Sequence, residues 1–356
     1  MHGEILDGTA GYAFFGVNIF FVLSGFLITG LLVSEWDKYY DISFRRFYCR
    51  RALRLLPALI LMMLVFVPLE FFIHPRGRAI HQLEQAFQVL LYCVNWVAMF
   101  WGKKYYFTHA WSLSIEEQFY FLWPPILLFM LRRSTRSSIL CWIFLAAVLS
   151  LVTRIAVFVG GTQNLSGNIF PVDPARICWG TDTRADSLLL GCFTGVLVFS
   201  NLVPKCLQNP RVLTTLAVAS IAGLYLLARG YLFSASMVCA GWFLCSVLAA
   251  IIILQLTTCS NTIIHVIFGF RPLVFIGQIS YGLYLWHGPI LCCLRDHNLP
   301  WRHLAFLVIT IPVVLLSYYF VERPFLTFKK QFERAPNSAT RDNVANEVTP
   351  GMALVK

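Results

Sequence analysis

Residues 109–123 read His-Ala-Trp-Ser-Leu-Ser-Ile-Glu-Glu-Gln-Phe-Tyr-Phe-Leu-Trp, a polar and aromatic stretch that leads directly into an apolar run. Glu116 and Glu117 are adjacent in it, and His109 and two serines precede them. A charged side chain at the start of a membrane segment is costly unless it has a partner or a function. We therefore expect this stretch to be a chemical centre around which the other segments are arranged.

Apolar side chains dominate the chain: 58% of the 356 residues are hydrophobic, 13% are charged, and the mean hydropathy is +0.70. A soluble fold cannot cover so much apolar surface, so the expected solvent is the lipid bilayer. The net charge of +11 comes from Lys and Arg in short gaps between apolar runs, which indicates membrane topology and argues against nucleic-acid binding. The expected fold class is all-α, a polytopic integral membrane helix bundle.

Several function classes are disfavoured because their motifs are absent. The eleven Cys lie mostly within apolar runs, without the paired spacing of a metal site or of disulfide-bonded loops. The sequence contains no Walker loop, no Gly-x-Gly-x-x-Gly turn and no His-Glu-x-x-His helix. We therefore expect neither a metal nor a resident cofactor.

Windows of about 20 residues predict nine membrane-spanning helices. They are expected near residues 14–34, 52–73, 119–131, 138–160, 183–200, 212–229, 234–256, 272–294 and 303–325. A tenth candidate, residues 82–101, has four polar residues in its first half and Asn95 in its second. If it does not cross, most loop Arg and Lys fall on one face. We therefore expect a re-entrant or interfacial helix there, nine to ten helices in all, an outer N-terminus and a cytoplasmic C-terminus.

The expected domain organisation is simple. Residues 1–334 form one membrane domain, in which no internal repeat is visible. Residues 335–356 are polar and unpatterned and cannot bury enough apolar surface to fold, so they are predicted to be a disordered cytoplasmic tail.

Arg50, Arg51 and Arg54 lie on the cytoplasmic approach to the second expected helix. Arg50 and Arg54 share one helical face, where like charges repel. A bound phosphate would relieve that repulsion, and the planar guanidinium suits phosphate because it donates two parallel hydrogen bonds. Anchoring at lipid headgroups is the alternative. Glu322 and Arg323, at the cytoplasmic end of the last span, either close an inner pocket with Arg51 and Arg54 or pair with each other.

The two adjacent glutamates have different expected roles. Ser114 and Glu117 have the spacing of a capping box, so Glu117 is expected to satisfy backbone donors at a helix start. Glu116 has no such structural explanation and is a candidate to accept a proton, orient a histidine or hold a sugar hydroxyl. Trp111 and Tyr120 suit stacking on a sugar ring, although aromatic residues also populate membrane interfaces.

Two further polar groups lie in expected membrane segments. Arg184 and Asp186 are two residues apart, so they face different directions and each needs its own partner. An ion-pair clamp between helices and a substrate role are both open. Ser280, Tyr284 and His287 share one face of an expected span. A histidine in a membrane helix is often structural, but a whole polar stripe indicates a cavity wall.

Six motifs, taken together and in order, resemble those of the acyltransferase family 3 membrane proteins. They are Gly-Val-Asn-Ile-Phe-Phe-Val-Leu-Ser-Gly-Phe-Leu-Ile at 16–28, Arg-Arg-Ala-Leu-Arg-Leu-Leu-Pro at 50–57, Trp-Ser-Leu-Ser-Ile-Glu-Glu-Gln-Phe-Tyr at 111–120, Arg-Ala-Asp at 184–186, Ser-Tyr-Gly-Leu-Tyr-Leu-Trp-His at 280–287 and Val-Glu-Arg-Pro-Phe at 321–325. Any one of these motifs is weak, but six in order are specific. The resemblance extends over nearly the whole chain up to about residue 325.

The resemblance implies transfer of an acyl group, usually acetyl, from cytoplasmic acyl-coenzyme A to a hydroxyl of a carbohydrate at the bacterial inner membrane. Members of the family have an Arg or Lys and an essential His in their first spanning helix. His2, fourteen residues before Gly16, looks like that histidine. We therefore expect the chain to lack most of its first helix, its start being truncated or misassigned, and this agrees with the odd number of expected spans.

The resemblance also implies roles for individual residues. The expected catalytic residues are His2 and Glu116. The expected acyl-coenzyme A site contains Arg50, Arg51, Arg54, Arg323 and Ser24. The expected acceptor site contains Trp111, Arg184, Asp186, Tyr284 and His287. A neutral histidine can take the proton of the acceptor hydroxyl as general base, with Glu116 orienting it. Direct transfer and an acyl-enzyme intermediate are both open.

The alternative function is a secondary transporter or flippase for a small solute or a lipid-linked sugar, because buried charge is equally natural in such a bundle. No inverted repeat is visible. The stripe of arginines formed by Arg50, Arg51 and Arg54 (the arginine stripe) suits a polyanionic acyl donor better than a transported solute. The sequence leaves open the identity of the acceptor, the acyl chain length and the oligomeric state.

Overall fold

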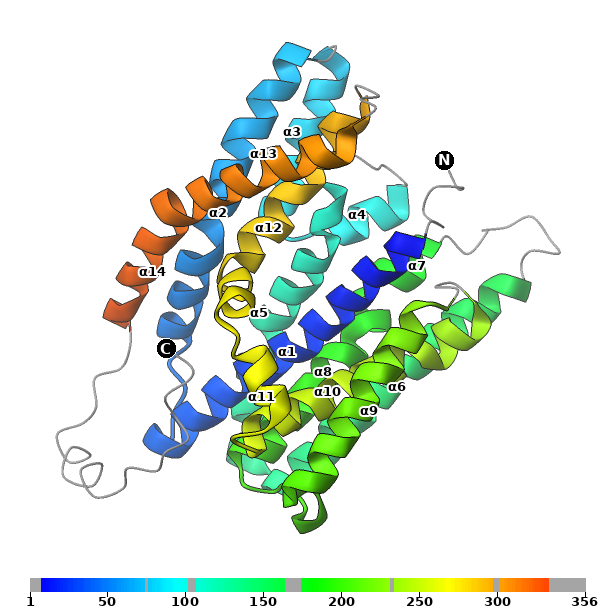
Figure 1. The fold of residues 1–356 in the computed structure, drawn as a ribbon, viewed down its shortest axis with the longest axis vertical. Coiled ribbons are helices and arrows are strands. Elements are labelled where there is room, and N and C mark those ends of the chain that lie inside the picture. The colour runs from blue at the N-terminus through cyan, green and yellow to red at the C-terminus, as the bar shows by residue number, and fades with distance from the viewer. Residues whose placement is uncertain are drawn as a thin grey trace. The chain divides into compact units, whose positions relative to one another are not determined.

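The structure is a computed structural model that describes residues 8–73, 76–101, 107–163, 174–230, 234–296 and 301–332. Every regular element in these ranges is helical (Figure 1), so the all-α prediction is confirmed. The α-helices are α1 Gly8–Tyr39, α2 Phe44–Ile73, α3 Arg76–Leu90, α4 Val94–Trp101, α5 Trp111–Arg133, α6 Arg136–Gln163, α7 Pro174–Trp179, α8 Thr181–Phe199, α9 Pro210–Ala228, α10 Trp242–Thr258, α11 Ile263–Phe268, α12 Arg271–Asp296, α13 Arg302–Ser317 and α14 Arg323–Lys329. Single π-helical turns precede α10 and α14.

Six helical segments among the described residues are long and apolar enough to cross a membrane. They are Phe14–Tyr39, Phe44–Leu69, Arg136–Gly160, Pro210–Ala228, Met237–Thr258 and His303–Phe328. The other three expected spans correspond to α5, α8 and α12, which are helices of 23, 19 and 26 residues. Both α5 and α8 contain several charged side chains, which lower their hydropathy. The expected count of nine to ten spans is therefore not confirmed.

Residues 82–101, expected to be re-entrant or interfacial, do not form one continuous helix. Helices α3 and α4 are separated by a turn at residues 91–93, in which Tyr92 has a φ of 52°. With 15 and 8 residues, the two helices are each shorter than the roughly 20 residues that a span requires. The break therefore argues against a single spanning helix here, and a re-entrant path stays a prediction.

The chain divides into two compact units. The first comprises residues Met1–Ile42 and Val67–Phe268, and the second comprises Ser43–Phe66 and Gly269–Lys356. The boundary expected between residues 334 and 335, together with the tail that follows it, lies outside the described residues.

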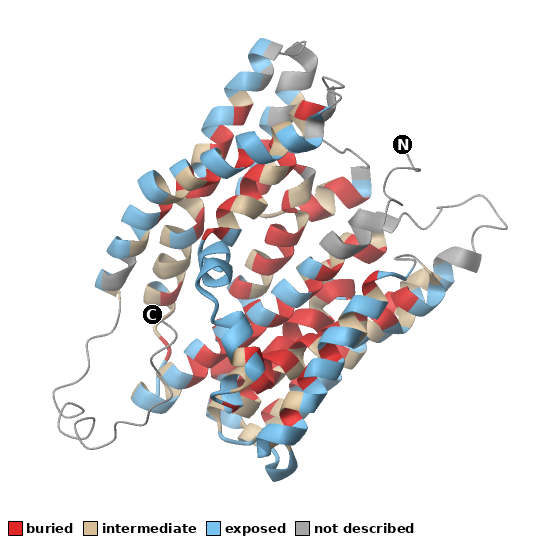
Figure 2. Cartoon of the chain, in the orientation of Figure 1, coloured by how far each residue is buried: buried red, intermediate tan, exposed pale blue. Residues whose placement is uncertain are grey.

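In the first unit, α1 packs against α8 and α10, while α8 also contacts α6. Small residues bring α1 and α8 close together. A Cβ atom added to Gly25 would lie 2.0 Å from the carbonyl oxygen of Leu188, and one added to Gly191 would lie 2.0 Å from that of Val22. Close backbone approach at glycine is typical of helix pairs in membranes. Buried residues accordingly concentrate where these helices meet, whereas α6 and α9 present many exposed side chains (Figure 2).

In the second unit, the first part of α2 packs with α12, and α12 packs with α13. The Tyr281 hydroxyl donates a hydrogen bond of 2.9 Å to the carbonyl oxygen of Leu55, and the rings of Phe66 and Trp286 lie 5.9 Å apart. Gly282 faces Glu322, because a Cβ atom at that position would lie 2.9 Å from Glu322 Oε1. These contacts place the motifs of residues 50–57, 280–287 and 321–325 within one unit.

Candidate active site

The helix in the stretch 109–123 begins earlier than the capping-box prediction requires. A short 3-10 turn, Thr108–Ala110, leads into α5, whose N-cap is Ala110 and has no side-chain cap. Ser114 therefore lies inside the helix, where its hydroxyl donates to the carbonyl oxygen of Ala110 at 3.3 Å. The prediction that Ser114 and Glu117 form a capping box is wrong, because the helix starts one turn before Ser114.

Glu116 is buried in the first unit and accepts hydrogen bonds from two hydroxyl groups. The Ser24 hydroxyl of α1 donates to Glu116 Oε1 at 2.5 Å, and the Tyr120 hydroxyl donates to the same oxygen. All three side chains are at most 6% exposed. Sequence reasoning assigned Ser24 to the acyl-coenzyme A site and Glu116 to catalysis, and the structure places the two side chains in direct contact. A carboxylate held in this way can orient a reacting group or exchange a proton with a hydroxyl.

The side chains of α5 next to this centre are fixed by a polar network that sequence reasoning missed. Gln118 donates to the carbonyl oxygen of Tyr92 at 2.7 Å and to Asn95 Oδ1 at 3.0 Å. Its carbonyl oxygen accepts from Thr181 at 2.6 Å and from Trp96 Nε1 at 3.1 Å. The network joins α4, α5 and the start of α8. Asn95, a polar residue within an apolar run, was the sequence feature that pointed to it.

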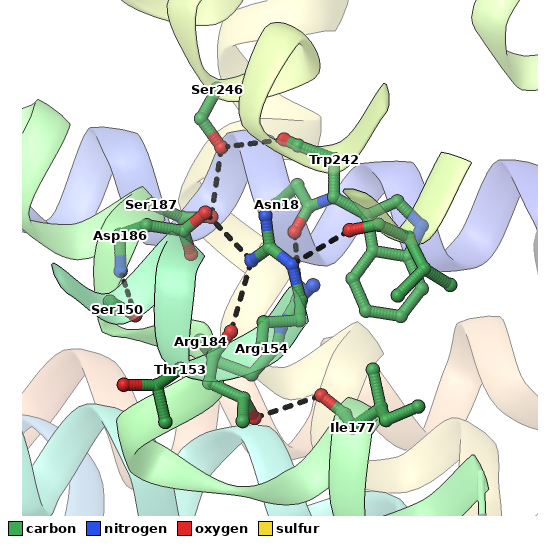
Figure 3. A network of polar contacts seen from close by, with 12 residues as sticks. Asn18, Ser150, Thr153, Arg154, Ile177, Arg184, Asp186, Ser187, Trp242 and Ser246 are labelled. Atoms are coloured by element: carbon green, nitrogen blue, oxygen red, sulfur yellow. Dashed lines mark hydrogen bonds and ion pairs between the residues drawn. The ribbon is translucent and has the colours of Figure 1, made fainter. Parts of the chain in front are cut away.

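Asp186, an expected acceptor residue, forms an ion pair with Arg154 of α6 (Figure 3). Arg154 Nη1 donates to Asp186 Oδ2 at 2.7 Å and to the carbonyl oxygen of Thr183 at 3.0 Å, and its Nε donates to the carbonyl oxygen of Val238 at 2.9 Å. Both charged side chains are fully buried. This contact is the interhelical clamp that the sequence left open. Sequence reasoning missed Arg154, although a single Arg in the apolar stretch 138–160 indicates a partner or a function.

Arg184, the neighbouring acceptor candidate, is also fully buried and donates to Asn18 Oδ1 of α1 (Figure 3). Its guanidinium carbon lies 4.5 Å from the ring centroid of Phe14 and 5.0 Å from that of Trp242. Trp111, expected to stack on a sugar, lies 6.4 Å from Phe14 in a stacked arrangement. The acceptor candidates of the first unit therefore adjoin one aromatic cluster.

In the second unit, Arg50 and Arg54 of α2 interact with the segment that follows α13. Arg50 donates to the carbonyl oxygen of Phe332 at 3.0 Å, and Arg54 interacts electrostatically with Glu322. Glu322 is 5% exposed and accepts from Ser317 at 3.3 Å. Arg54 is exposed and Arg51 is half-buried. The stripe thus presents guanidinium groups at the surface of this unit, where an anion can reach them.

Three further expected site residues of the second unit make other contacts. Arg323 is exposed, with its guanidinium 5.8 Å from the ring centroid of Tyr319. His287 and Tyr284 are half-buried on α12, with ring centroids 5.5 Å apart. The Nδ1 atom of His287 lies 2.5 Å from the carbonyl oxygen of Tyr284. Because a carbonyl only accepts, Nδ1 bears the proton of a neutral ring, and Nε2 is then its acceptor.

The remaining expected catalytic residue, His2, lies outside the described residues. Within the described ranges, no three His, Cys, Asp or Glu side chains come together in a way that could hold a metal ion. The structure therefore brings together Glu116 and Ser24 in the first unit, and Arg54 and Glu322 in the second.

The Acyltransferase domain family matches residues 5–322 of the chain. This chain belongs to that acyltransferase family. The match covers every motif on which the sequence resemblance rested, up to Glu322 of the last motif, so the predicted family is confirmed.

Several bacterial proteins are similar to this acyltransferase family member along most of its length. Peptidoglycan O-acetyltransferase OatA of Listeria monocytogenes is 33% identical over 353 residues, which cover 90% of this chain and 53% of OatA. O-acetyltransferase OatA of Staphylococcus aureus is 28% identical over 327 residues, 87% of this chain and 52% of the relative. Putative peptidoglycan O-acetyltransferase YrhL of Bacillus subtilis is 31% identical over 343 residues, 89% of this chain and 51% of YrhL.

The chain thus spans about half the length of the curated relatives that it matches. No solved structure matches it. The six membrane-length helices and the bacterial relatives together support a multi-pass bacterial membrane protein.

Proposed function

We propose that this chain is a membrane O-acetyltransferase that moves an acyl group, acetyl in the first instance, from cytoplasmic acyl-coenzyme A to a hydroxyl of a cell-envelope carbohydrate. The peptidoglycan O-acetyltransferases among its relatives support a carbohydrate of the peptidoglycan class as acceptor. The observation that supports acyl transfer most directly is the buried Glu116 carboxylate with Ser24 at 2.5 Å. Membership of the acyltransferase family does not favour the transporter alternative.

In this proposal Glu116 either supports the general base or is itself the base. His2 serves as general base for the acceptor hydroxyl, and Glu116 orients the histidine or stabilises its charged form. The short contact between Ser24 and Glu116 also supports a second route. In it the carboxylate takes the Ser24 proton, the serine oxygen bonds to the acyl carbon and the coenzyme A thiolate leaves. The acceptor hydroxyl then attacks the serine ester, and Ser24 leaves and regains a proton. Both routes require Glu116 to be ionised, and both lose rate when its charge is removed.

The arginine stripe is the proposed site for the phosphates of the donor. Arg50, Arg51 and Arg54 follow one another along α2, and Arg323 begins α14 in the same unit. Guanidinium groups recognise phosphate by charge-assisted, paired hydrogen bonds. Since acyl-coenzyme A is a cytoplasmic donor, this proposal places the stripe and the C-terminus on the cytoplasmic face.

Two groups of aromatic and charged residues, each within its own unit, are the proposed contacts of the acceptor. Trp111 and Arg184 adjoin the aromatic cluster of the first unit, next to Asp186. Tyr284 and His287 lie together on α12 of the second unit. Aromatic rings and a histidine suit a sugar, which offers apolar ring faces and hydroxyl groups.

The donor assignment is tested by steady-state kinetics of the Arg51→Gln and Arg54→Gln variants in detergent or vesicles. Each is expected to raise the KM for acetyl-coenzyme A by about tenfold, because one charge-assisted hydrogen bond contributes roughly 1.5–3 kcal/mol. Arg45→Gln is the matched control, since Arg45 lies on the same helix and is exposed. A donor KM unchanged in both variants would contradict the assignment.

A further inference from the structure

Among the described residues, the groups around Arg184 do not neutralise its positive charge. The acidic and basic side chains there that interact with Arg184 are Asp186 and Arg154. Asp186 is itself ion-paired with Arg154 at 2.7 Å. Two guanidinium groups and one carboxylate leave this fully buried cluster with one excess positive charge. Because an uncompensated buried charge is strongly unfavourable, its retention in a helix bundle indicates a function.

The hydrogen-bond donors of Arg184 and Asn18 show where a negative group would bind. Arg184 donates to Asn18 Oδ1 through Nη2. Within the part of the chain that the structure describes, Nε and Nη1 of Arg184 and Nδ2 of Asn18 are buried without an acceptor. Three buried donor nitrogens without an acceptor, on two touching side chains, are costly in a folded protein. A negatively charged oxygen would satisfy both the hydrogen bonds and the charge.

The aromatic rings around Arg184 stabilise its positive charge but do not neutralise it. The guanidinium carbon lies 4.5 Å from the ring centroid of Phe14, 5.0 Å from that of Trp242 and 5.8 Å from that of Phe21. Cation–π contacts of this kind stabilise a guanidinium without adding negative charge. Such surroundings exclude water, so the attraction of Arg184 for an anion is stronger than it would be in solvent.

We propose that Arg184 and Asn18 form a buried binding site for one negatively charged oxygen of the reacting complex, and that Arg154 is a positioning residue for this site. By pairing with Asp186, Arg154 prevents that carboxylate from neutralising Arg184 two residues away. Asp186 then affects the acceptor site indirectly, by holding Arg154 in place. The inference rests on the proposed acyl transfer, which creates or brings in such an oxygen.

Two oxygens of the reaction have the required charge. When the acceptor hydroxyl oxygen bonds to the acyl carbon and its proton passes to the base, the carbonyl π electrons become a lone pair on the carbonyl oxygen. That charge is lost when the C=O bond re-forms and the coenzyme A thiolate leaves. The other candidate is a carboxylate of the acceptor. Preorganised N–H donors would favour the reaction in the first case and binding in the second.

The sharpest test is Asn18→Asp, which places a carboxylate on Arg184 with almost no change of shape. The variant is expected to melt at a temperature equal to or above that of the wild type, because the buried charge becomes paired. Acetyl transfer is expected to fall by at least about 100-fold, because the anion site is filled from within. A fall in kcat at unchanged KM assigns the site to the carbonyl oxygen, and a raised acceptor KM assigns it to an acceptor carboxylate. Wild-type transfer by Asn18→Asp would overturn the proposal.

A second comparison does not depend on enzymatic activity. Arg184→Met is expected to leave the Tm of the purified chain unchanged or raised, whereas Arg154→Met is expected to lower it by several degrees, because the buried hydrogen bonds of Arg154 to Asp186 and to the carbonyl oxygens of Thr183 and Val238 are lost. Sodium acetate, compared with sodium chloride at equal ionic strength, is expected to raise the Tm of the wild type but not that of Asn18→Asp. Equal loss of Tm in both arginine variants would overturn the anion site. If the wild type transfers no acetyl group, the proposed function fails while these Tm measurements still judge the site.

Discussion

Single residues of the first unit define the proposed chemistry. The Glu116 oxygen that accepts from Ser24 also accepts from Tyr120, so two hydroxyl donors hold this buried carboxyl group in place. Gln118, two residues further along α5, makes four hydrogen bonds to α4, α8 and the turn between α3 and α4. We therefore expect Glu116 to contribute to reactivity and Gln118 to fix the orientation of α5.

The role of Gln118 is tested by Gln118→Leu, which removes one hydrogen bond from each of four polar partners. The expected loss of unfolding free energy is on the order of 1–3 kcal/mol, because buried polar groups lose their acceptor or donor. Thermal unfolding of the purified chain in detergent measures it. Gln278→Leu is the control, since Gln278 is exposed on α12 and should have little effect. Equal changes in both variants would contradict the role assigned to the network.

The sequence indicated Glu116 as a candidate, because a carboxylate without a capping role stands out in an apolar context, and the structure shows that it is buried. The sequence was not sufficient to pair Glu116 with Ser24, since 92 residues separate them and only the packing of α1 against α5 brings them together. Arg154 was missed for a similar reason. Its partner, Asp186, is on another helix, and nothing in the local sequence of either residue identifies the pair.

At the level of helices, the contact between α1 and α8 positions both charged clusters of the first unit. Gly25 and Gly191 allow the two backbones to approach closely. Helix α1 supplies Asn18 and Ser24, and α8 supplies Arg184. The hydrophobic pattern predicted both helices but not their ends. The start of α5 differs from the capping-box prediction because hydrogen bonding begins at Trp111, and the turn at residues 91–93 interrupts a stretch that composition alone could not divide.

The close approach is tested by Gly191→Ala. The added Cβ would lie 2.0 Å from the carbonyl oxygen of Val22, which is backbone and cannot rotate away. Overpacking of this kind is expected to cost about 1–3 kcal/mol of unfolding free energy. Gly16→Ala in α1 is the matched control, because a Cβ there meets nothing within 4 Å and alanine favours a helix. A Gly191→Ala variant as stable as Gly16→Ala would contradict the packing.

At the level of the whole molecule, the family and the all-helical class were predictable, because both depend on composition and on motifs within continuous segments. The number of membrane spans was harder to predict from the sequence. Helices α5, α8 and α12 are long enough to cross, but their polar and charged residues make their hydropathy ambiguous. The same polar residues that obscure the span count are those that we assign to the proposed site.

The proposed orientation is tested with alkaline phosphatase, which is active only outside the cytoplasm. A fusion after Lys356 is expected to be inactive, because the positive-inside pattern places the C-terminus in the cytoplasm. A fusion after Gly230, between α9 and α10, is expected to be active. The reverse pattern of activities would contradict the proposed topology and the cytoplasmic position of the arginine stripe.

The central claim is acyl transfer that depends on Glu116. Vesicles containing the purified chain are supplied with acetyl-coenzyme A labelled in the acetyl group and with a peptidoglycan-type carbohydrate. We expect the wild type and Glu117→Gln to place label on the carbohydrate as an alkali-labile ester, and Glu116→Gln to do so at least about 100-fold more slowly. Label transfer by Glu116→Gln at the wild-type rate, or the absence of any ester from the wild type, would contradict the claim.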